Sequence, residues 1–249
     1  MILTVIGSGT AVPSVERGAP CLHLAAGGRS LVFDLGSGSV RQLWKKGIDV
    51  RLIDVLALTH FHPDHTADLV PLLFALANPE FGRDGEMLLV GPAGLTKYVT
   101  DLERIYGDWI RPPLLRLHVR EIGTGEVQVG GVTLSAALSG HTEGSLAFRV
   151  DDKERSMVYG GDSVACDSLV GIAAGADLLV LESSFPEGTR CDGHMTPTEA
   201  AGVAAGAEAK KLLLTHFYPA ADAADCLTPA RGRYGGEILL AADGLRIEI

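Results

Sequence analysis

Three histidines and one aspartate fall within six consecutive positions of this chain, in the segment Thr59-His60-Phe61-His62-Pro63-Asp64-His65. The segment directly follows Val55 to Leu58, an apolar run of strand length. The 249 residues contain only eight histidines, so this concentration argues against a polar loop with incidental histidines. Imidazole and carboxylate together suit zinc or a similar divalent ion. The fold must therefore present the end of a buried strand to a metal site.

Short β-rich runs followed by glycine turns, several of them before amphipathic stretches, indicate an α/β layered fold. The expected strands are Ile2–Ile6, Cys21–Ala25, Ser30–Asp34, Val55–Leu58, Glu86–Val90, Val119–Ile122, Glu126–Val129, Val132–Leu138, Ser145–Val150, Ser156–Tyr159, Leu178–Glu182 and Lys211–Thr215. The expected helices are Ser39–Lys46, Thr66–Ala77, Leu95–Tyr106 and Thr196–Ala209. We interpret the five consecutive strands from Val119 to Tyr159 as one meander.

A six-residue pattern occurs twice. Leu58-Thr59-His60-Phe61-His62-Pro63 and Leu214-Thr215-His216-Phe217-Tyr218-Pro219 share L-T-H-F-x-P, each at the end of an apolar strand. Open α/β sheets bind ligands at the carboxyl ends of their strands. The pattern therefore indicates two related halves that each deliver a histidine to the site. No linker or low-complexity segment separates them, so we expect one domain over residues 1–249.

The composition limits the partners and the compartment. With 21 basic and 31 acidic residues the net charge is −10, which argues against a broad nucleic-acid or membrane-binding face. Cys21, Cys166, Cys191 and Cys226 lie far apart without a C-x-x-C pair, so we expect ordinary thiols. The amino terminus has no basic leader, and no apolar run approaches the ~18 residues of a spanning helix. We expect a cytoplasmic protein with no membrane association.

Three further donors follow predicted strands and stand beside glycine or another small residue. They are His141, Asp162 and His216. Small neighbours let the backbone approach closely, so that a short side chain can reach a central point. We interpret His23 and His118, which lie in apolar strand-like surroundings, as structural. The potential ligands then number seven, enough for two ions that share one carboxylate: His60, His62, Asp64, His65, His141, Asp162 and His216.

This arrangement resembles the metallo-β-lactamase superfamily of binuclear hydrolases. The resemblance rests on H-x-H-x-D-H, a later histidine, G-D-[ST] and a strand-end histidine, and it extends from Phe33 to His216. Within the superfamily the chain is most similar to the branch of ribonuclease Z and related phosphodiesterases. The segments that carry this similarity are Gly7–Ser14, His141–Arg149, Leu181–Phe185 and His194–Thr196. The resemblance implies a four-layer αββα sandwich.

The resemblance also implies a ligand set. His60, His62 and His141 are expected to bind one ion, Asp64, His65 and His216 the other, and Asp162 to bridge them. Zinc is the expected ion, and manganese and iron accept the same ligands. The nucleophile would be a hydroxide between the ions, because metal coordination lowers the pKa of water. Two dications, two carboxylates and one hydroxide leave a formal positive charge, which favours a small anionic substrate.

Departure of an alkoxide needs a proton. By resemblance His194 is the general acid and Glu182 holds it, since a carboxylate raises the pKa of an imidazole. The alternative makes His194 a helix-start residue without chemistry. With the ligand Asp64, these two residues form the expected catalytic set. Asp34 is expected to orient a metal-binding histidine, because such histidines usually donate their other N–H to an acceptor.

The chain departs from ribonuclease Z in two places. Enzymes that process transfer RNA typically carry a long arm between the histidine matched by His141 and the aspartate matched by Asp162. Here one strand, a short turn at Asp151 to Arg155 and a second strand join them. Pro63 also stands where the ribonucleases usually have glycine. With the net charge of −10, these departures make a folded tRNA an unfavoured substrate.

Three functions remain open. The first is a metal-dependent phosphodiesterase for small diesters such as cyclic nucleotides or alkyl and aryl phosphodiesters. The second hydrolyses a carboxylic ester, lactone, thioester or sulfate ester at the same metals, and tRNA 3′-end processing ranks below both. The third is a non-catalytic or oxygen-reducing protein, disfavoured because oxygen-reducing relatives use carboxylate-rich ligands where this chain has His62 and His65. Relatives further imply a homodimer.

Overall fold

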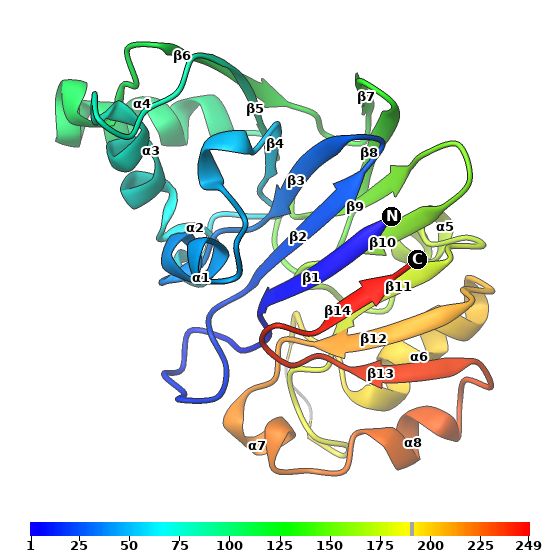
Figure 1. Ribbon diagram of the computed structural model, residues 1–249. Coiled ribbons are helices and arrows are strands. Elements are labelled where there is room, and N and C mark those ends of the chain that lie inside the picture. The colour runs from blue at the N-terminus through cyan, green and yellow to red at the C-terminus, as the bar shows by residue number, and fades with distance from the viewer. Residues whose placement is uncertain (190–191) are drawn as a thin grey trace.

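Two seven-stranded sheets form the centre of the computed structural model, which describes residues 1–189 and 192–249 (Figure 1). The first sheet contains β1 (Ile2–Gly7), β2 (Cys21–Ala26), β3 (Arg29–Phe33), β4 (Val55–Ala57), β5 (Gly85–Gly91), β6 (Leu115–Glu121) and β14 (Arg246–Glu248). The second contains β7 (Glu126–Val129), β8 (Val132–Leu138), β9 (Leu146–Asp151), β10 (Ser156–Tyr159), β11 (Leu178–Glu182), β12 (Lys211–Thr215) and β13 (Glu237–Leu240).

The two sheets share one plan. The first runs β14-β1-β2-β3-β4-β5-β6, with antiparallel pairs up to β3 and parallel pairs from β3 onward. The second runs β7-β8-β9-β10-β11-β12-β13, with the same change of direction at β10. The sheets are therefore related halves, although the last strand, β14, returns to complete the first sheet beside β1.

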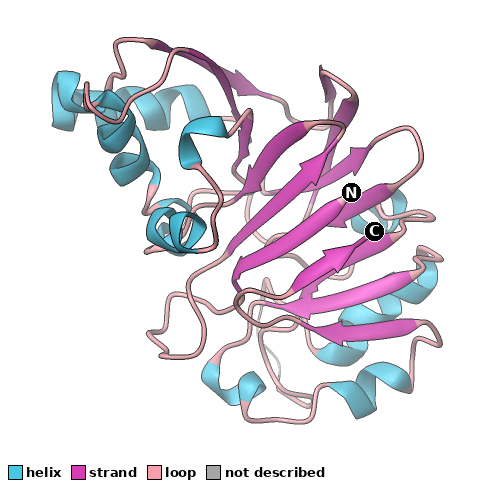
Figure 2. Cartoon of the chain, in the orientation of Figure 1, coloured by secondary structure: helices cyan, strands magenta, loops and turns pink. Residues whose placement is uncertain are grey.

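Helices cover the outer face of each sheet (Figure 2). The helices are α1 (Ser39–Lys45), α2 (Pro63–Thr66), α3 (Leu69–Ala77), α4 (Leu95–Tyr106), α5 (Asp167–Ile172), α6 (Pro197–Gly206), α7 (Pro219–Asp222) and α8 (Leu227–Arg231), with 3₁₀ turns at Val50–Leu52 and Gly107–Ile110. Buried leucines of α1, α3 and α4 pack on the first sheet, and α5, α6 and α8 lie against the second. This four-layer αββα arrangement confirms the expected fold class.

Aromatic rings fill the space between the sheets near the site. Phe33 at the end of β3 lies 6.1 Å from Phe148 of β9 and 6.0 Å from Tyr159 of β10, measured between ring centroids. All three side chains are buried. The carboxyl ends of β3 and β10, where each sheet changes from antiparallel to parallel, are thus held against each other. Ligands of open α/β sheets bind at such switch points.

Two expectations about the elements are wrong. The strand expected to open the meander is β6, which instead pairs in parallel with β5 in the first sheet; the meander is β7 to β10. The helix expected over Thr66–Ala77 begins only at Leu69 as α3, and Thr66 ends the preceding helix α2. Asp68 lies at the break, and its carboxylate accepts hydrogen bonds from the backbone N–H groups of Gly38 and Val40 at 2.9 and 2.8 Å. This tie to the start of α1 redirects the chain.

The helix predicted over Thr196–Ala209 also extends too far at its carboxyl-terminal end. The helix ends at Gly206, and Glu208 adopts a positive φ of 52°, which no α-helix contains. The strands β13 and β14 and the short helices α5, α7 and α8 were not predicted, although α7 begins at Pro219, the last residue of the second L-T-H-F-x-P pattern. In the described part of the chain no helix is long and apolar enough to cross a bilayer.

Candidate metal centre

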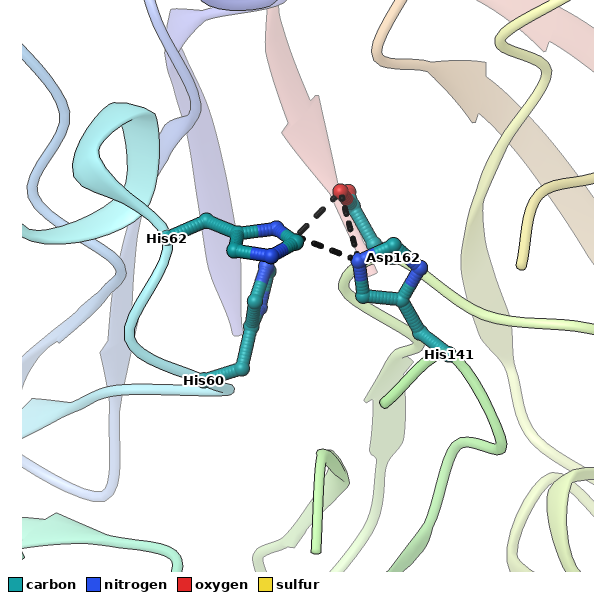
Figure 3. A group of neighbouring side chains, drawn as sticks. All are labelled: His60, His62, His141 and Asp162. Carbon is teal, nitrogen blue, oxygen red and sulfur yellow. Dashed lines mark hydrogen bonds and ion pairs between the residues drawn. The ribbon is translucent and has the colours of Figure 1, made fainter. Parts of the chain in front are cut away.

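Strand ends of both sheets deliver the seven predicted donors to one place. From the first sheet, the turn after β4 carries His60 and His62, and α2 carries Asp64 and His65. From the second sheet, His141 follows β8, Asp162 follows β10 and His216 follows β12. In Figure 3 the side chains of His60, His62, His141 and Asp162 point toward one another from these separate segments. The sequence motif and the distant donors therefore meet, as expected.

The Asp162 carboxylate lies between two groups of donors. Its Oδ1 is 3.2 Å from Nε2 of His65 and 3.2 Å from Nε2 of His216. Its Oδ2 is 3.8 Å from Nε2 of His60 and 3.7 Å from Nε2 of His141. Ligand atoms held about 2.1 Å from one tetrahedral ion lie about 3.4 Å from each other. The spacing thus suits one ion on each side of the carboxylate.

The grouping of the donor atoms agrees with this division. The ligand atoms of His60, His62, His141 and Asp162 all lie within 4.8 Å of one another. Those of Asp64, His65 and His216 form a second such group, with Asp64 Oδ2 3.7 Å from His216 Nε2. Imidazole nitrogen and carboxylate oxygen are the ligands of zinc and similar divalent ions.

Unpaired buried atoms test whether divalent ions fit. Nε2 of His60, His65 and His216 and Oδ1 of Asp162 are buried without a hydrogen-bond partner among the described residues. A buried polar atom left unpaired costs about 1–3 kcal/mol, so the atoms of each group need a partner. Divalent cations satisfy all four, and the residues present therefore fit them.

The opposite nitrogen of each ring is held by a hydrogen bond. His65 Nδ1 lies 2.7 Å from Asp34 Oδ2, His60 Nδ1 3.0 Å from Thr59 Oγ1, His216 Nδ1 2.9 Å from Ser184 Oγ, and His141 Nδ1 2.7 Å from the Gly193 carbonyl oxygen. Such contacts orient a ligand imidazole and fix which nitrogen carries the proton. Asp34 was expected here. Thr59, Ser184 and Gly193 were not, although Thr59 and Ser184 lie inside segments that the sequence singled out.

The electrostatics of the cluster favour positive charge. Burial by itself raises the pKa of Asp162, but the His216 and His65 rings outweigh it and hold that pKa well below the usual value. Burial lowers the pKa of His65, yet Asp162 and Asp34 raise it well above 6.5. Burial and the neighbouring His65 lower the pKa of His60 to about 2. The carboxylates thus favour a cation beside His65, while His60 stays neutral, as a metal ligand must.

The predicted pair of His194 and Glu182 adjoins the cluster. His194 Nδ1 lies 3.0 Å from each oxygen of the Glu182 carboxylate, which is fully buried at the end of β11. Ser163 N–H and the Ser184 hydroxyl also donate to this carboxylate. Burial lowers the pKa of His194, but the hydrogen bond and charge of Glu182 outweigh it, so the pKa is raised from 6.5. Its ring centroid is 4.7 Å from that of His141.

Close backbone packing fixes the loop that carries Asp64. A Cβ at Gly36 would lie 2.1 Å from the Asp64 carbonyl oxygen, so only glycine fits there. Asp34 and His216 adopt positive φ angles of 55° and 57°, a strained conformation that is typical of functional sites. The sequence placed the glycines near the donors but did not indicate these two strained residues.

The remaining histidines and cysteines lie elsewhere. His23 is buried on β2 with Nε2 3.0 Å from Ser30 Oγ, in keeping with a structural role. His118 is not in apolar surroundings, because the edge strand β6 leaves 48% of its side chain exposed beside Glu86. Of the described residues, the three cysteines Cys21, Cys166 and Cys226 are free thiols. The expectation for Cys191 lies outside the described residues.

Comparison with known proteins identifies the family. The family described as "Beta-lactamase superfamily domain" matches residues 30–217. The chain belongs to the metallo-β-lactamase superfamily. It is 30% identical over 274 aligned positions to a protein named Ribonuclease Z from Mycobacterium marinum, covering 99% of this chain and 98% of that protein.

Two solved structures resemble this superfamily member over its whole length. The metallo-beta-lactamase fold protein YhfI from Bacillus subtilis has a TM-score of 0.85 and 26% identity, and the comparison covers 100% of this chain and 99% of that one. The short form of human tRNase Z has a TM-score of 0.81 and 26% identity, with the same coverage. The chain is thus a ribonuclease Z-like hydrolase of the metallo-β-lactamase superfamily, with a His and Asp cluster able to hold divalent metals.

Proposed function

We propose that this hydrolase is a phosphodiesterase that acts on small phosphodiesters with two divalent ions, zinc being the expected metal. The observation that carries the proposal is the contact of His194 with Glu182 beside the donor cluster. A hydrolase of activated esters needs no strong acid, whereas an alkoxide leaving group does. A buried carboxylate that holds a histidine at the metal site supports phosphodiester chemistry.

In this proposal the metal-binding residues and the proton donor have different roles. His60, His62 and His141 would hold one ion and Asp64, His65 and His216 the other, while the Asp162 carboxylate, which faces both groups, would serve both. Such ions polarise a phosphoryl group and lower the pKa of water. Glu182 accepts the Nδ1 proton of His194, which leaves the Nε2–H to donate to the departing oxygen. Ser184 links the two parts, because its hydroxyl contacts both Glu182 and His216.

The space beside His194 suits a small substrate. A cavity of about 520 Å³ adjoins this residue, within the range of small-molecule sites. Hydroxyl groups and carboxylates line it, among them Thr189, Thr198, Glu187 and Glu199. A cavity of this size admits a small diester.

The relatives named Ribonuclease Z and tRNase Z support a second candidate, an RNA endonuclease. Three observations argue against it. The connection between β9 and β10 consists of Asp152 to Arg155 alone. The alignment with the M. marinum protein spans 274 positions, more than the 249 residues of this chain, so that relative carries segments that this chain lacks. The net charge of −10 also opposes a folded RNA.

A substrate panel tests the proposal. The zinc- or manganese-loaded protein is assayed with bis(p-nitrophenyl) phosphate, with cyclic nucleotides, with carboxylic ester, lactone, thioester and sulfate-ester panels, and with a precursor tRNA. We expect hydrolysis of the small diesters, lost in Asp162→Ala and retained in His118→Ala, whose side chain lies exposed on β6. Turnover of only the carboxylic substrates, or of only the tRNA, would refute it.

A further inference from the structure

A buried chain of hydrogen bonds joins one ligand of each proposed ion. His60 Nδ1 lies 3.0 Å from Thr59 Oγ1, and Thr59 Oγ1 lies 3.0 Å from both oxygens of Asp34. Asp34 Oδ2 in turn lies 2.7 Å from His65 Nδ1. Asp34, Thr59 and His65 are fully buried and His60 is 3% exposed, so water does not compete for these contacts.

The chemistry of the groups fixes the direction of each proton in this chain. A carboxylate only accepts hydrogen bonds, so the Thr59 hydroxyl donates its single proton to Asp34. Its oxygen is then free only to accept, and His60 must donate to it from Nδ1–H. His65 likewise donates from Nδ1–H to Asp34. Nε2 is therefore the nitrogen of each ring that is left to bind a metal, which it does through its lone pair.

The surroundings of the Nε2 atoms fit a metal ion on that side of both rings. The Nε2 atoms of both His60 and His65 are buried without a hydrogen-bond partner among the described residues, and both face the Asp162 carboxylate. The opposite tautomer of His60 would place its only lone pair against the Thr59 hydroxyl and reverse that contact. The Thr59 hydroxyl would then donate to His60, and Asp34 would lose the hydrogen bond that it accepts from Thr59.

The chain is also fastened to the second sheet. The Tyr159 hydroxyl, at the end of β10, donates to Asp34 Oδ2 at 2.9 Å, and Tyr159 is 3% exposed. The Leu146 N–H of β9 donates to the Thr59 carbonyl oxygen at 2.9 Å. Asp34 and Thr59 belong to the first sheet, whereas His141 and Asp162 follow strands of the second. These two contacts therefore set the histidines of one sheet relative to the donors of the other.

We propose that Thr59 and Tyr159 are positioning residues of the metal centre. Thr59 sets the tautomer of His60 and links it to Asp34, and Tyr159 holds Asp34, and through it His65, from the opposite sheet. The proposal rests on the metal centre of the proposed function, but not on the identity of the substrate. The two residues are expected to have different effects. The Thr59 hydroxyl contacts both Asp34 and His60, a ligand of one ion, whereas the Tyr159 hydroxyl hydrogen-bonds to Asp34 and to no ligand.

Histidine tautomers and metal affinity provide the test. Ring ¹⁵N shifts are measured in the metal-free and zinc-bound protein, and the affinity for each zinc ion is measured by chelator-buffered titration of the His60 and His65 signals. We expect His60 in the neutral Nδ1–H form in the metal-free wild type, and both rings in that form when zinc is bound. Thr59→Val should move His60 toward the Nε2–H form and weaken binding at His60 by about 10–100-fold, the usual effect of losing such a contact. Thr59→Ser, which keeps the hydroxyl, should restore both.

Tyr159→Phe should act on the other ion. Binding at His65 should weaken about tenfold, while the tautomer of His60 stays unchanged. Tyr234→Phe is the matched control, because it also removes a buried hydroxyl, one that donates to the Ala209 carbonyl oxygen at 2.6 Å away from the site. It should destabilise the protein without changing either affinity.

Several results would overturn the proposal. The wild-type measurement needs no variant. An Nε2–H form of His60 in the metal-free protein, or of either ring in the zinc-bound protein, would refute the proposal. Unchanged affinities in both Thr59→Val and Tyr159→Phe would do the same, as would equal effects of Tyr159→Phe and Tyr234→Phe. A protein that binds zinc as expected but hydrolyses no phosphodiester would refute the proposed substrate and leave this inference standing.

Discussion

His23 makes the stability of the fold depend on pH. It is 9% exposed on β2, and burial lowers the pKa of its imidazole from 6.5 to about 4. At a pH between these two pKa values, the unfolded chain binds a proton at His23 and the folded chain does not. Protonation of His23 therefore costs no free energy of unfolding above pH 6.5, and the free energy of unfolding decreases as the pH falls below that value. From the two pKa values the loss is about 2 kcal/mol at pH 5 and approaches about 3 kcal/mol below pH 4.

Urea unfolding of wild type and His23→Gln at pH 8 and pH 5 measures this loss. The free energy of unfolding of the wild type should fall by about 2 kcal/mol more than that of the variant between the two pH values, because all other groups titrate in both proteins. His118→Gln removes an exposed histidine and should behave as the wild type. An equal fall in wild type and His23→Gln would refute the reasoning from burial.

Three further substitutions test the site. His194→Ala should slow diesters with poor leaving groups by about 10²–10⁴-fold and p-nitrophenyl diesters far less, since nitrophenolate departs unprotonated; equal losses in steady-state rates would contradict the acid role. Asp162→Ala removes the carboxylate that faces both donor groups, so elemental analysis after dialysis should find at most one tightly held ion, and two would count against the bridge. Gly36→Ala should cost about 1–3 kcal/mol and lower metal content, because its Cβ meets the Asp64 carbonyl oxygen; unchanged calorimetry would disprove this close packing.

The sequence indicated the donor cluster well because its signals are local. His60, His62, Asp64 and His65 lie in one turn, and the distant donors stand at strand ends beside small residues. Whether a side chain ends a strand can be judged from a few neighbours. Which hydroxyl contacts which imidazole cannot, because that depends on how two sheets pack. Tyr159 therefore carried no signal before the structure showed its contact with Asp34.

The error over β6 has a related cause. Leu115, Leu117 and Val119 alternate with exposed residues, which indicates a strand with one buried face. That alternation does not say which sheet the strand joins. The short segment from Glu121 to Glu126 passes from the first sheet to the second, and nothing in its composition distinguishes it from a hairpin turn. Pairing between sheets is a tertiary choice that periodicity alone does not encode.

The repeated L-T-H-F-x-P pattern relates the halves less directly than its letters indicate. The strands become parallel at β3 in the first sheet and at β10 in the second. His60 follows β4, the strand next to β3, whereas His216 follows β12, which is two strands away from β10. The equivalent strands β3 and β10 are instead followed by Asp34, one residue on, and by Asp162, three residues on. Each of these carboxylates lies against His65. What the two motifs share is local, because each joins a buried parallel strand to a four-residue helix that has proline in its first turn. We therefore attribute the residues that the two motifs share to this strand-to-helix turn, which directs a histidine inward. The two aspartates that follow β3 and β10 are the better evidence that the halves are related.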